Sequence, residues 1–372
     1  MKSLKLSLLL FFVFESIYSQ DITVKNLTAE HKNNPVGIDV LQPRLSWKIY
    51  GTGNNIMQTS YSIRVATDQK FSSGKMVWQS GKTESGESVL VSYNGPALKS
   101  GIKYFWQVKV RDNMGRESKW SDPASWEMGL LSPSDWKSKW IEMKGDTNRF
   151  SPSPHFRKDF IVAKTIQNAE VYVTSHGFYE LHINGSKVGD QVLTPGWTSY
   201  GKRLQYQVYD VTSQLVKGNN AIGAVLGDGW YRGTLAWGDN WAIYGKRLGL
   251  FVQLKLVYTD GSEELVVSDE SWKCNNDGAL RMSDIYDGEI YDANKKLTGW
   301  DQSGYNDTKW EKVTIGNHPF NLIASEGALV RKIQEIKPVK IFRTPKGSLV
   351  ADMGQNMVGS IEFTKFIQHF GM

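Results

Sequence analysis

Tyr179-Glu180-Leu181-His182-Ile183-Asn184-Gly185-Ser186-Lys187 alternates apolar and polar residues as far as Ile183 and then reaches Asn184-Gly185. Alternation with a period of two is typical of a half-buried β-strand. Asn-Gly favours a two-residue type I′ turn, because both central positions of that turn need positive φ. The stretch therefore predicts a β-hairpin, and Asp260-Gly261 predicts a second one by the same reasoning.

The same alternation recurs along most of the chain, in short segments bounded by Gly, Asn, Asp or Pro. It predicts strands at residues 44–49, 60–66, 89–91, 104–110, 169–174, 221–226 and 251–258. Residues 98–104 lead into one of these strands as a tyrosine corner does in a β-sandwich. We find no convincing helix of three turns; the best helical candidate is one or two turns at residues 212–217, which Thr212 would cap and Gly218 would end.

We therefore expect an all-β protein whose domains follow one another along the chain. Residues 20–130 are expected to form a fibronectin type III-like sandwich, and residues 131–317 a jelly-roll or galactose-binding-like β-sandwich. Residues 318–372 carry strand-like segments at 339–342, 347–352 and 359–363. About 50 residues are too few for another large sandwich, so we interpret them as the truncated start of a further β-sandwich domain.

The composition favours a folded globular protein and argues against nucleic-acid binding. Apolar residues make up 40% and charged residues 22% of the 372, and the net charge of +6 is scattered without a long basic run. Aromatic residues reach 12%, which suits both sandwich cores and sugar-stacking surfaces. Cys274 is the single cysteine, so the chain forms no internal disulfide, and we expect this residue to be a small buried hydrophobe.

The first 19 residues are typical of a secretory signal peptide. Lys2 and Lys5 precede an apolar run at residues 6–14, and Ile17-Tyr18-Ser19 offers a cleavage site. This run is far shorter than the roughly 20 residues needed to span a bilayer. We therefore expect export to the periplasm or the extracellular space, without a membrane-spanning segment.

Several longer motifs of the middle region resemble one known family. In order and spacing they look like the N-terminal part of bacterial α-L-rhamnosidases of glycoside hydrolase family 78. The motifs that carry the resemblance lie at residues 156–160, 179–190, 193–200, 209–212, 226–233 and 283–293, and residues 352–359 resemble the start of the family's next β-domain.

The resemblance implies an inverting hydrolysis of terminal α-L-rhamnose from a glycoside or polysaccharide. In the family, acidic residues of an (α/α)6 barrel carry out this reaction, and the barrel follows β-domains such as these. No such barrel is present in this sequence, so no catalytic residue can be assigned. We expect the chain to be inactive alone, with the missing barrel as its intramolecular partner in the parent enzyme.

An acidic cluster at Asp284, Asp287, Glu289 and Asp292 admits three interpretations. An acid and a base about 6.5–9.5 Å apart would suit an inverting glycosidase. Carboxylate oxygens also suit Ca²⁺, although no EF-hand pattern is present, so calcium stays possible but unassigned and no cofactor is expected to be required. The favoured interpretation is that these side chains cap turns around Gly288 and line a domain interface.

The segment 228–241 is the best candidate for a carbohydrate-binding surface, because it combines Trp rings, hydrogen-bonding side chains and glycines that allow sharp turns. Packing of the sandwich or docking against the barrel is the structural alternative. A stand-alone carbohydrate-binding or scaffold protein is the alternative function. The candidate residues are Asp228, Trp230, Tyr231, Arg232, Trp237, Asp239, Asn240 and Trp241.

Overall fold

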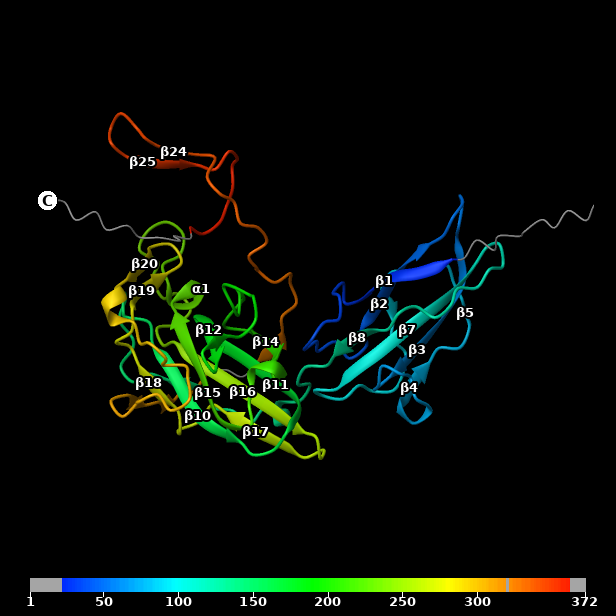
Figure 1. Ribbon diagram of the computed structural model, residues 1–372, viewed down its shortest axis with the longest axis horizontal. Coiled ribbons are helices and arrows are strands. Elements are labelled where there is room, and N and C mark those ends of the chain that lie inside the picture. The colour runs from blue at the N-terminus through cyan, green and yellow to red at the C-terminus, as the bar shows by residue number, and fades with distance from the viewer. Residues whose placement is uncertain (1–21, 319–320, 362–372) are drawn as a thin grey trace, which may run out of the picture. The chain divides into compact units, whose positions relative to one another are not determined.

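The structure is a computed structural model that describes residues 22–318 and 321–361, and almost all of its regular structure is β-strand (Figure 1). Its longest α-helix in these residues is a single turn, α1 (Gly229–Arg232). The described residues divide into two units, of which the first holds those up to residue 189 and those within 193–328, and the second holds residues 190–192 and 329–361. The all-β fold class predicted from the sequence is confirmed. No helix of the described residues is both long enough and apolar enough to cross a membrane.

The N-terminal part of the first unit is a small sandwich of two antiparallel sheets. Alternating residues of both sheets meet in a core that contains Trp47, Trp106 and Trp126. Tyr104 forms the predicted tyrosine corner, because its hydroxyl accepts a hydrogen bond from the backbone N–H of Lys99 at 3.0 Å. One sheet runs β4 (Met76–Gln79), β3 (Gln58–Ala66), β7 (Lys103–Asp112), β8 (Ala124–Glu127), with β5 (Thr83–Glu84) on β3, and the other runs β1 (Thr23–Ala29), β2 (Arg44–Tyr50), β6 (Val91–Ser92).

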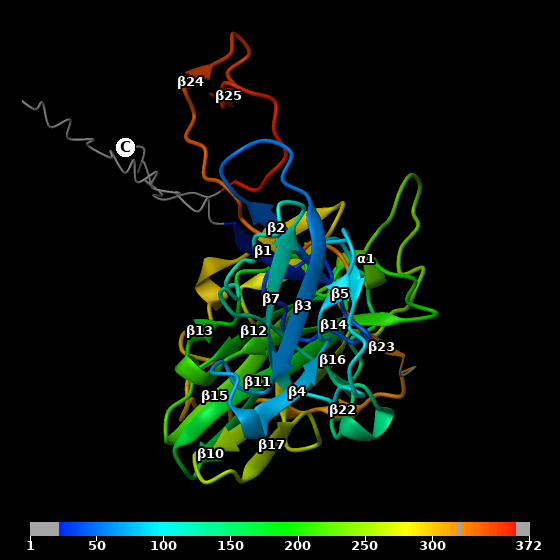
Figure 2. The same cartoon turned by 90° about the vertical axis from the view of Figure 1, so that its right-hand side faces the viewer.

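The rest of the first unit is a larger sandwich, in which a six-stranded sheet faces a seven-stranded one. Strands far apart in sequence are neighbours, such as β10 (His155–Val162) and β15 (Gly218–Gly227), so the chain crosses between the sheets repeatedly. The first sheet runs β13 (Ser186–Lys187), β12 (Phe178–Ile183), β15 (Gly218–Gly227), β10 (His155–Val162), β18 (Lys273–Asn275), β21 (Glu311–Lys312). The second runs β22 (Thr314–Ile315), β9 (Ile141–Glu142), β16 (Gly249–Tyr258), β11 (Ile166–His176), β14 (Leu204–Asp210), β23 (Leu322–Ala324), with β17 (Glu263–Val267) on β16 (Figure 2).

Apolar residues from the inner faces of these two sheets form the main core. On β12 the alternation works as predicted, because Tyr179, Leu181 and Ile183 are buried while Glu180 is exposed. Cys274 belongs to the same core and is fully buried, as predicted. Burial raises the pKa of its thiol to about 12. A buried neutral thiol of this kind packs as a hydrophobe.

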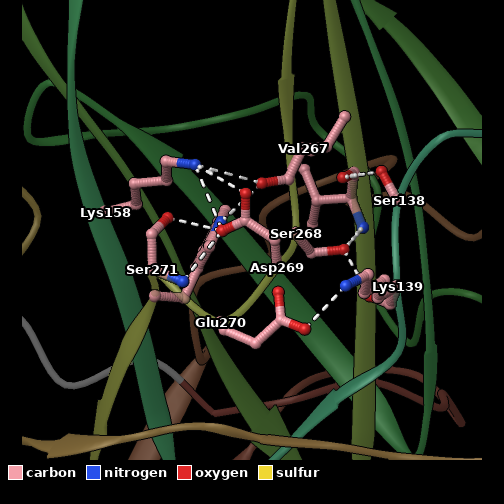
Figure 3. A network of polar contacts seen from close by, with 10 residues as sticks. Ser138, Lys139, Lys158, Val267, Ser268, Asp269, Glu270 and Ser271 are labelled. Atoms are coloured by element: carbon pink, nitrogen blue, oxygen red, sulfur yellow. Dashed lines mark hydrogen bonds and ion pairs between the residues drawn. The ribbon is translucent and has the colours of Figure 1, made fainter.

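A polar network ties the end of β17 to the neighbouring segments (Figure 3). The hydroxyl of fully buried Ser268 donates to the carbonyl of Lys139 at 2.7 Å and accepts from the backbone N–H of Val252 at 3.1 Å. Nearby, the Lys158 ammonium lies 3.3 Å from the Asp269 carboxylate. The Ser268 hydroxyl thus satisfies two backbone groups inside the sandwich, where water does not compete.

Two turns that carried the same prediction differ in the structure. Asn184 and Gly185 have φ of 50° and 82° and join β12 to β13 as a two-residue turn, as predicted. A hairpin also forms between β16 and β17, but Gly261 alone has positive φ and the loop spans residues 259–262. The expected two-residue turn is wrong there, because the chain closes through a Tyr258–Ser262 backbone hydrogen bond instead.

Two further local predictions need correction. Val89 and Leu90 lie outside the strand, because Leu90 takes φ of 54° and the strand β6 contains Val91–Ser92 only. The helical candidate is one short 3-10 turn, η3 (Thr212–Gln214), preceded by Val211 without a side-chain cap. Other 3-10 turns are η1 (Ser73–Lys75), η2 (Pro133–Asp135) and η4 (Ala293–Lys295).

The second unit contains one antiparallel hairpin, β24 (Lys340–Arg343) with β25 (Leu349–Asp352). It matches the strands predicted at residues 339–342 and 347–352. The third strand of that prediction is not formed at residues 359–361, and residues 362 and 363 lie outside the described part of the chain. Residues 1–19, for which a signal peptide is predicted, also lie outside it.

Candidate functional site

The segment 228–241 leaves the end of β15 and folds back over a buried ion-pair network. The Arg232 guanidinium is closed off from solvent; its Nε donates to Asp228 at 2.7 Å and its Nη1 to Asp146 at 2.8 Å. Burial raises the pKa of the Asp228 carboxyl to about 6, although Arg232 acts in the opposite direction. Such a network fixes the path of the backbone, because separating its partners would leave charges buried and unpaired.

A second polar cluster lies on the solvent side of the first. Arg149 pairs with Asp239 and donates from Nη2 to Thr234 at 3.0 Å and to Asp287 at 3.2 Å. Hydrogen bonds from Thr234 and Arg149 lower the pKa of the Asp287 carboxyl. Asp284 accepts from the backbone N–H of Thr234 at 2.7 Å. The hairpin β19 (Leu280–Asp284) and β20 (Gly288–Tyr291) is thereby joined to the segment 228–241.

The outer part of the segment is a tight loop that presents Trp237 to solvent. The backbone N–H of Leu235 donates to the carbonyl of Asn240 at 3.0 Å, and the Asn240 amide donates to the carbonyl of Trp237 at 2.8 Å. Trp237 is 93% exposed at the tip. The Lys246 ammonium lies 5.3 Å from the ring centre of Trp241 at the base of the loop.

The eight candidate residues therefore fall into two groups. Asp228, Tyr231 and Arg232 are buried, so they are placed to hold the segment in position. The residues with accessible side chains are Trp230, Trp237, Asp239, Asn240 and Trp241. Whether these bind carbohydrate stays a prediction.

Of the acidic cluster, Asp284 caps the turn that leads to Gly288, as predicted, and Asp292 caps the next turn, η4, while the predicted domain interface stays a prediction. Asp284 Oδ1 accepts from the backbone N–H groups of Tyr286 and Asp287 at 2.8 and 3.0 Å, and Asp292 accepts from that of Asn294 at 3.0 Å. Among the residues that the structure describes, no group of three or more His, Cys, Asp or Glu side chains is arranged to hold a metal ion.

An aromatic cluster next to the segment was not predicted from the sequence. Trp197 and Trp230 stack in parallel, with ring centres 5.7 Å apart and an interplanar angle of 7°. Tyr200 packs against both Tyr231 and Tyr244, with ring centres 5.2 and 4.9 Å apart. The sequence offered one sign of this cluster, since Pro195-Gly196-Trp197 places an aromatic residue directly after a turn.

Comparisons with known proteins agree with this architecture. Residues 164–357 match the family described as the α-L-rhamnosidase N-terminal domain. This range contains the segment 228–241 and all strands of the larger sandwich that follow β10 in the chain. The chain belongs to this family. Residues 24–132 match a second family, described as the Rha78A-like N-terminal immunoglobulin domain. The resemblance inferred from the motifs is therefore confirmed, whereas the finer assignment of the first domain to the fibronectin type III class stays a prediction.

Relatives of known name support the same family. An α-L-rhamnosidase of Formosa agariphila is 36% identical over 361 residues, which cover 89% of this chain and 38% of the relative. An α-L-rhamnosidase of Streptomyces avermitilis is 27% identical, over 91% of this chain and 49% of the relative. The chain thus spans about two fifths to one half of the length of these relatives.

Solved structures show the same fold. The S. avermitilis α-L-rhamnosidase complexed with L-rhamnose superposes with a TM-score of 0.84 at 26% identity, over 90% of this chain and 49% of that one. The α-L-rhamnosidase from Dictyoglumus thermophilum gives a TM-score of 0.82 at 35% identity, over 91% of this chain and 39% of that one. The β-sandwich architecture is therefore common to these α-L-rhamnosidases and to this chain.

Proposed function

We propose that this chain is the N-terminal, non-catalytic part of an exported α-L-rhamnosidase that removes terminal α-L-rhamnose from glycosides or polysaccharides with inversion. The observation that carries the proposal is the match of residues 164–357 to the α-L-rhamnosidase N-terminal domain. The names of the relatives support it, and the part of each relative that this chain leaves uncovered is long enough for a catalytic domain.

The contacts of the acidic cluster support a non-catalytic role. A glycosidase acid or base must be free to exchange a proton with the glycosidic oxygen or with water. Asp284 and Asp292 instead accept backbone hydrogen bonds, and Asp287 is engaged by Thr234 and Arg149. These carboxylates act as structural acceptors.

The accessible residues of the segment 228–241 support a contact with substrate sugar. Trp237 and Trp241 have accessible rings, while Asp239 and Asn240 offer carboxylate and amide groups for sugar hydroxyls. The buried network of Arg232 holds the base of this segment in place. Preorganisation of this kind lowers the entropy cost of binding.

Two activity assays test the proposal, one of the purified chain and one of a hybrid enzyme. Alone, the chain should not hydrolyse an aryl α-L-rhamnoside. A hybrid enzyme, in which the chain replaces the matched region of the Formosa agariphila relative, should hydrolyse the same substrate. Turnover by the chain alone that a single carboxylate substitution abolishes would contradict the non-catalytic role. A folded hybrid that is inactive would contradict the assignment to a rhamnosidase.

A further inference from the structure

The parallel pair Trp197 and Trp230 forms a small aromatic shelf at the surface of the larger sandwich. Trp197 comes from the loop after β13 and Trp230 from α1, so distant parts of the sequence build the shelf. Phe178 supports Trp230 from below, edge to face, with ring centres 4.9 Å apart. The Trp197 side of the shelf is open, because this residue is 52% exposed.

The shelf is held rigidly in place. Trp197 Nε1 donates to the Tyr244 hydroxyl at 3.3 Å, and the Tyr244 ring packs on buried Tyr200. Gly229 takes φ of 53°, and a Cβ there would lie 2.8 Å from the Phe178 ring. Glycine is therefore required for Trp230 to reach its position over Phe178. A ring already held in its binding position loses little freedom when a ligand stacks on it.

One polar group is placed directly at the shelf. The Tyr244 hydroxyl accepts from Trp197 Nε1 at 3.3 Å and can still donate to a ligand. A flat aromatic face beside a hydroxyl group matches a ligand with one apolar face and a rim of hydroxyl groups.

We propose that this shelf is a binding subsite for a pyranose ring of the glycan substrate, which stacks its C–H face on the open side of Trp197. The inference rests on the proposed function and deepens it, because it places a sugar contact mostly outside the segment 228–241. Trp237 is a weaker candidate, since no ring contact is found for it among the described residues. An unsupported ring must be ordered by the ligand, which costs binding free energy.

Titration of the purified full chain with methyl α-L-rhamnopyranoside and with a rhamnosylated oligosaccharide tests the subsite. Calorimetry gives the affinity, and saturation-transfer NMR shows which sugar protons meet the protein. We expect millimolar binding through C–H protons of one ring face. Trp197→Ala should weaken binding at least tenfold, whereas Trp197→Phe, which keeps a flat ring, should weaken it only a few-fold. Trp237→Ala tests the other candidate surface and should weaken binding less than Trp197→Ala does. Tyr50→Ala, which removes an exposed aromatic ring from the small sandwich, is the matched control and should leave the affinity unchanged.

Three results would overturn the subsite. The first is the absence of sugar binding by the folded wild-type chain at 50 mM ligand. The second is a loss of binding in Trp237→Ala with none in Trp197→Ala, which would move the contact to the loop tip. The third is a self-association of the chain, measured by sedimentation, that Trp197→Ala abolishes without a change in sugar affinity. The hybrid enzyme separates this inference from the proposed function, because a hybrid that hydrolyses rhamnosides without sugar binding at the shelf contradicts the subsite alone.

Discussion

The Arg232 guanidinium and the Asp146 carboxylate lie 2.8 Å apart in the interior of the larger sandwich, where neither side chain is more than 4% exposed. Arg232 also pairs with Asp228, so Arg232→Met would leave two buried carboxylates without their cation. Breaking a buried pair in this way costs about 3–5 kcal/mol. We expect the free energy of unfolding in urea at pH 7 to fall by that amount.

Arg149→Met is the matched control for this prediction. Arg149 also pairs with two aspartates, but the side chain of Asp239 is 79% exposed and that of Asp287 is 36% exposed. Solvent-exposed ion pairs contribute little to stability. Arg149→Met should therefore lower the free energy of unfolding much less than Arg232→Met does, and equal losses would contradict the structural role of Arg232.

Ser268→Ala should destabilise the larger sandwich by about 1–3 kcal/mol, because it leaves the Lys139 carbonyl and the Val252 N–H without their shared hydroxyl partner (Figure 3). Exposed Ser271 provides the comparison, since Ser271→Ala keeps its backbone hydrogen bond to Asp269. That second variant should change the unfolding free energy by less than about 0.5 kcal/mol. Urea denaturation followed by tryptophan fluorescence measures both, and an unaltered midpoint for Ser268→Ala would show that water replaces the hydroxyl.

Gly223→Ala should be among the most damaging small substitutions in β15. A Cβ at this position would lie 2.5 Å from the Trp300 ring and 2.6 Å from the carbonyl oxygen of Phe156. Overpacking of a filled core typically costs about 1–3 kcal/mol. Gly201→Ala has open space within 4 Å and should melt at the wild-type temperature. If both alanine variants melt together, the β15–Trp300 contact is looser than the structure indicates.

Much of the fold follows from local sequence rules, because alternation and turn chemistry act within a few residues. Asn184-Gly185 specified its turn, since both residues accept positive φ. Asp260-Gly261 specified a hairpin but not its loop length, which the pairing of β16 with β17 decides. Loop length in that hairpin depends on contacts between strands, and these are not visible in a dipeptide.

The candidate site was harder to predict because burial of charged residues depends on tertiary contacts. Asp228 and Arg232 were expected at a sugar-binding surface, yet both are buried. Their spacing of four residues is the one local sign of their pairing. Trp197 and Trp230 are 33 positions apart in the sequence, and nothing in either motif indicates that their rings stack. Asp146, the third member of the buried network, lies in a loop without a recognisable motif.

The stability of the larger sandwich should fall in mild acid, and His155 should account for a defined part of that loss. Burial lowers the pKa of the His155 imidazole to about 4, against about 6.5 in an unfolded chain. A depressed pKa means that the unfolded state binds the proton more tightly. The stabilising contribution is therefore complete above pH 6.5 and is lost as the pH falls through 4.

Between pH 7.5 and pH 4.5 the His155 contribution should decrease by on the order of 2 kcal/mol. His155→Asn removes the titration, while the Asn amide can still donate to the Ser153 carbonyl that His155 Nδ1 contacts at 3.2 Å. Urea unfolding at both pH values should therefore show a smaller acid loss in this variant. Some loss should persist, because burial also lowers the pKa of His176, to about 3. Exposed His31 supplies the control, His31→Asn. If the free energy of unfolding falls by the same amount between pH 7.5 and pH 4.5 in His155→Asn and in the control, protonation of His155 is not coupled to unfolding.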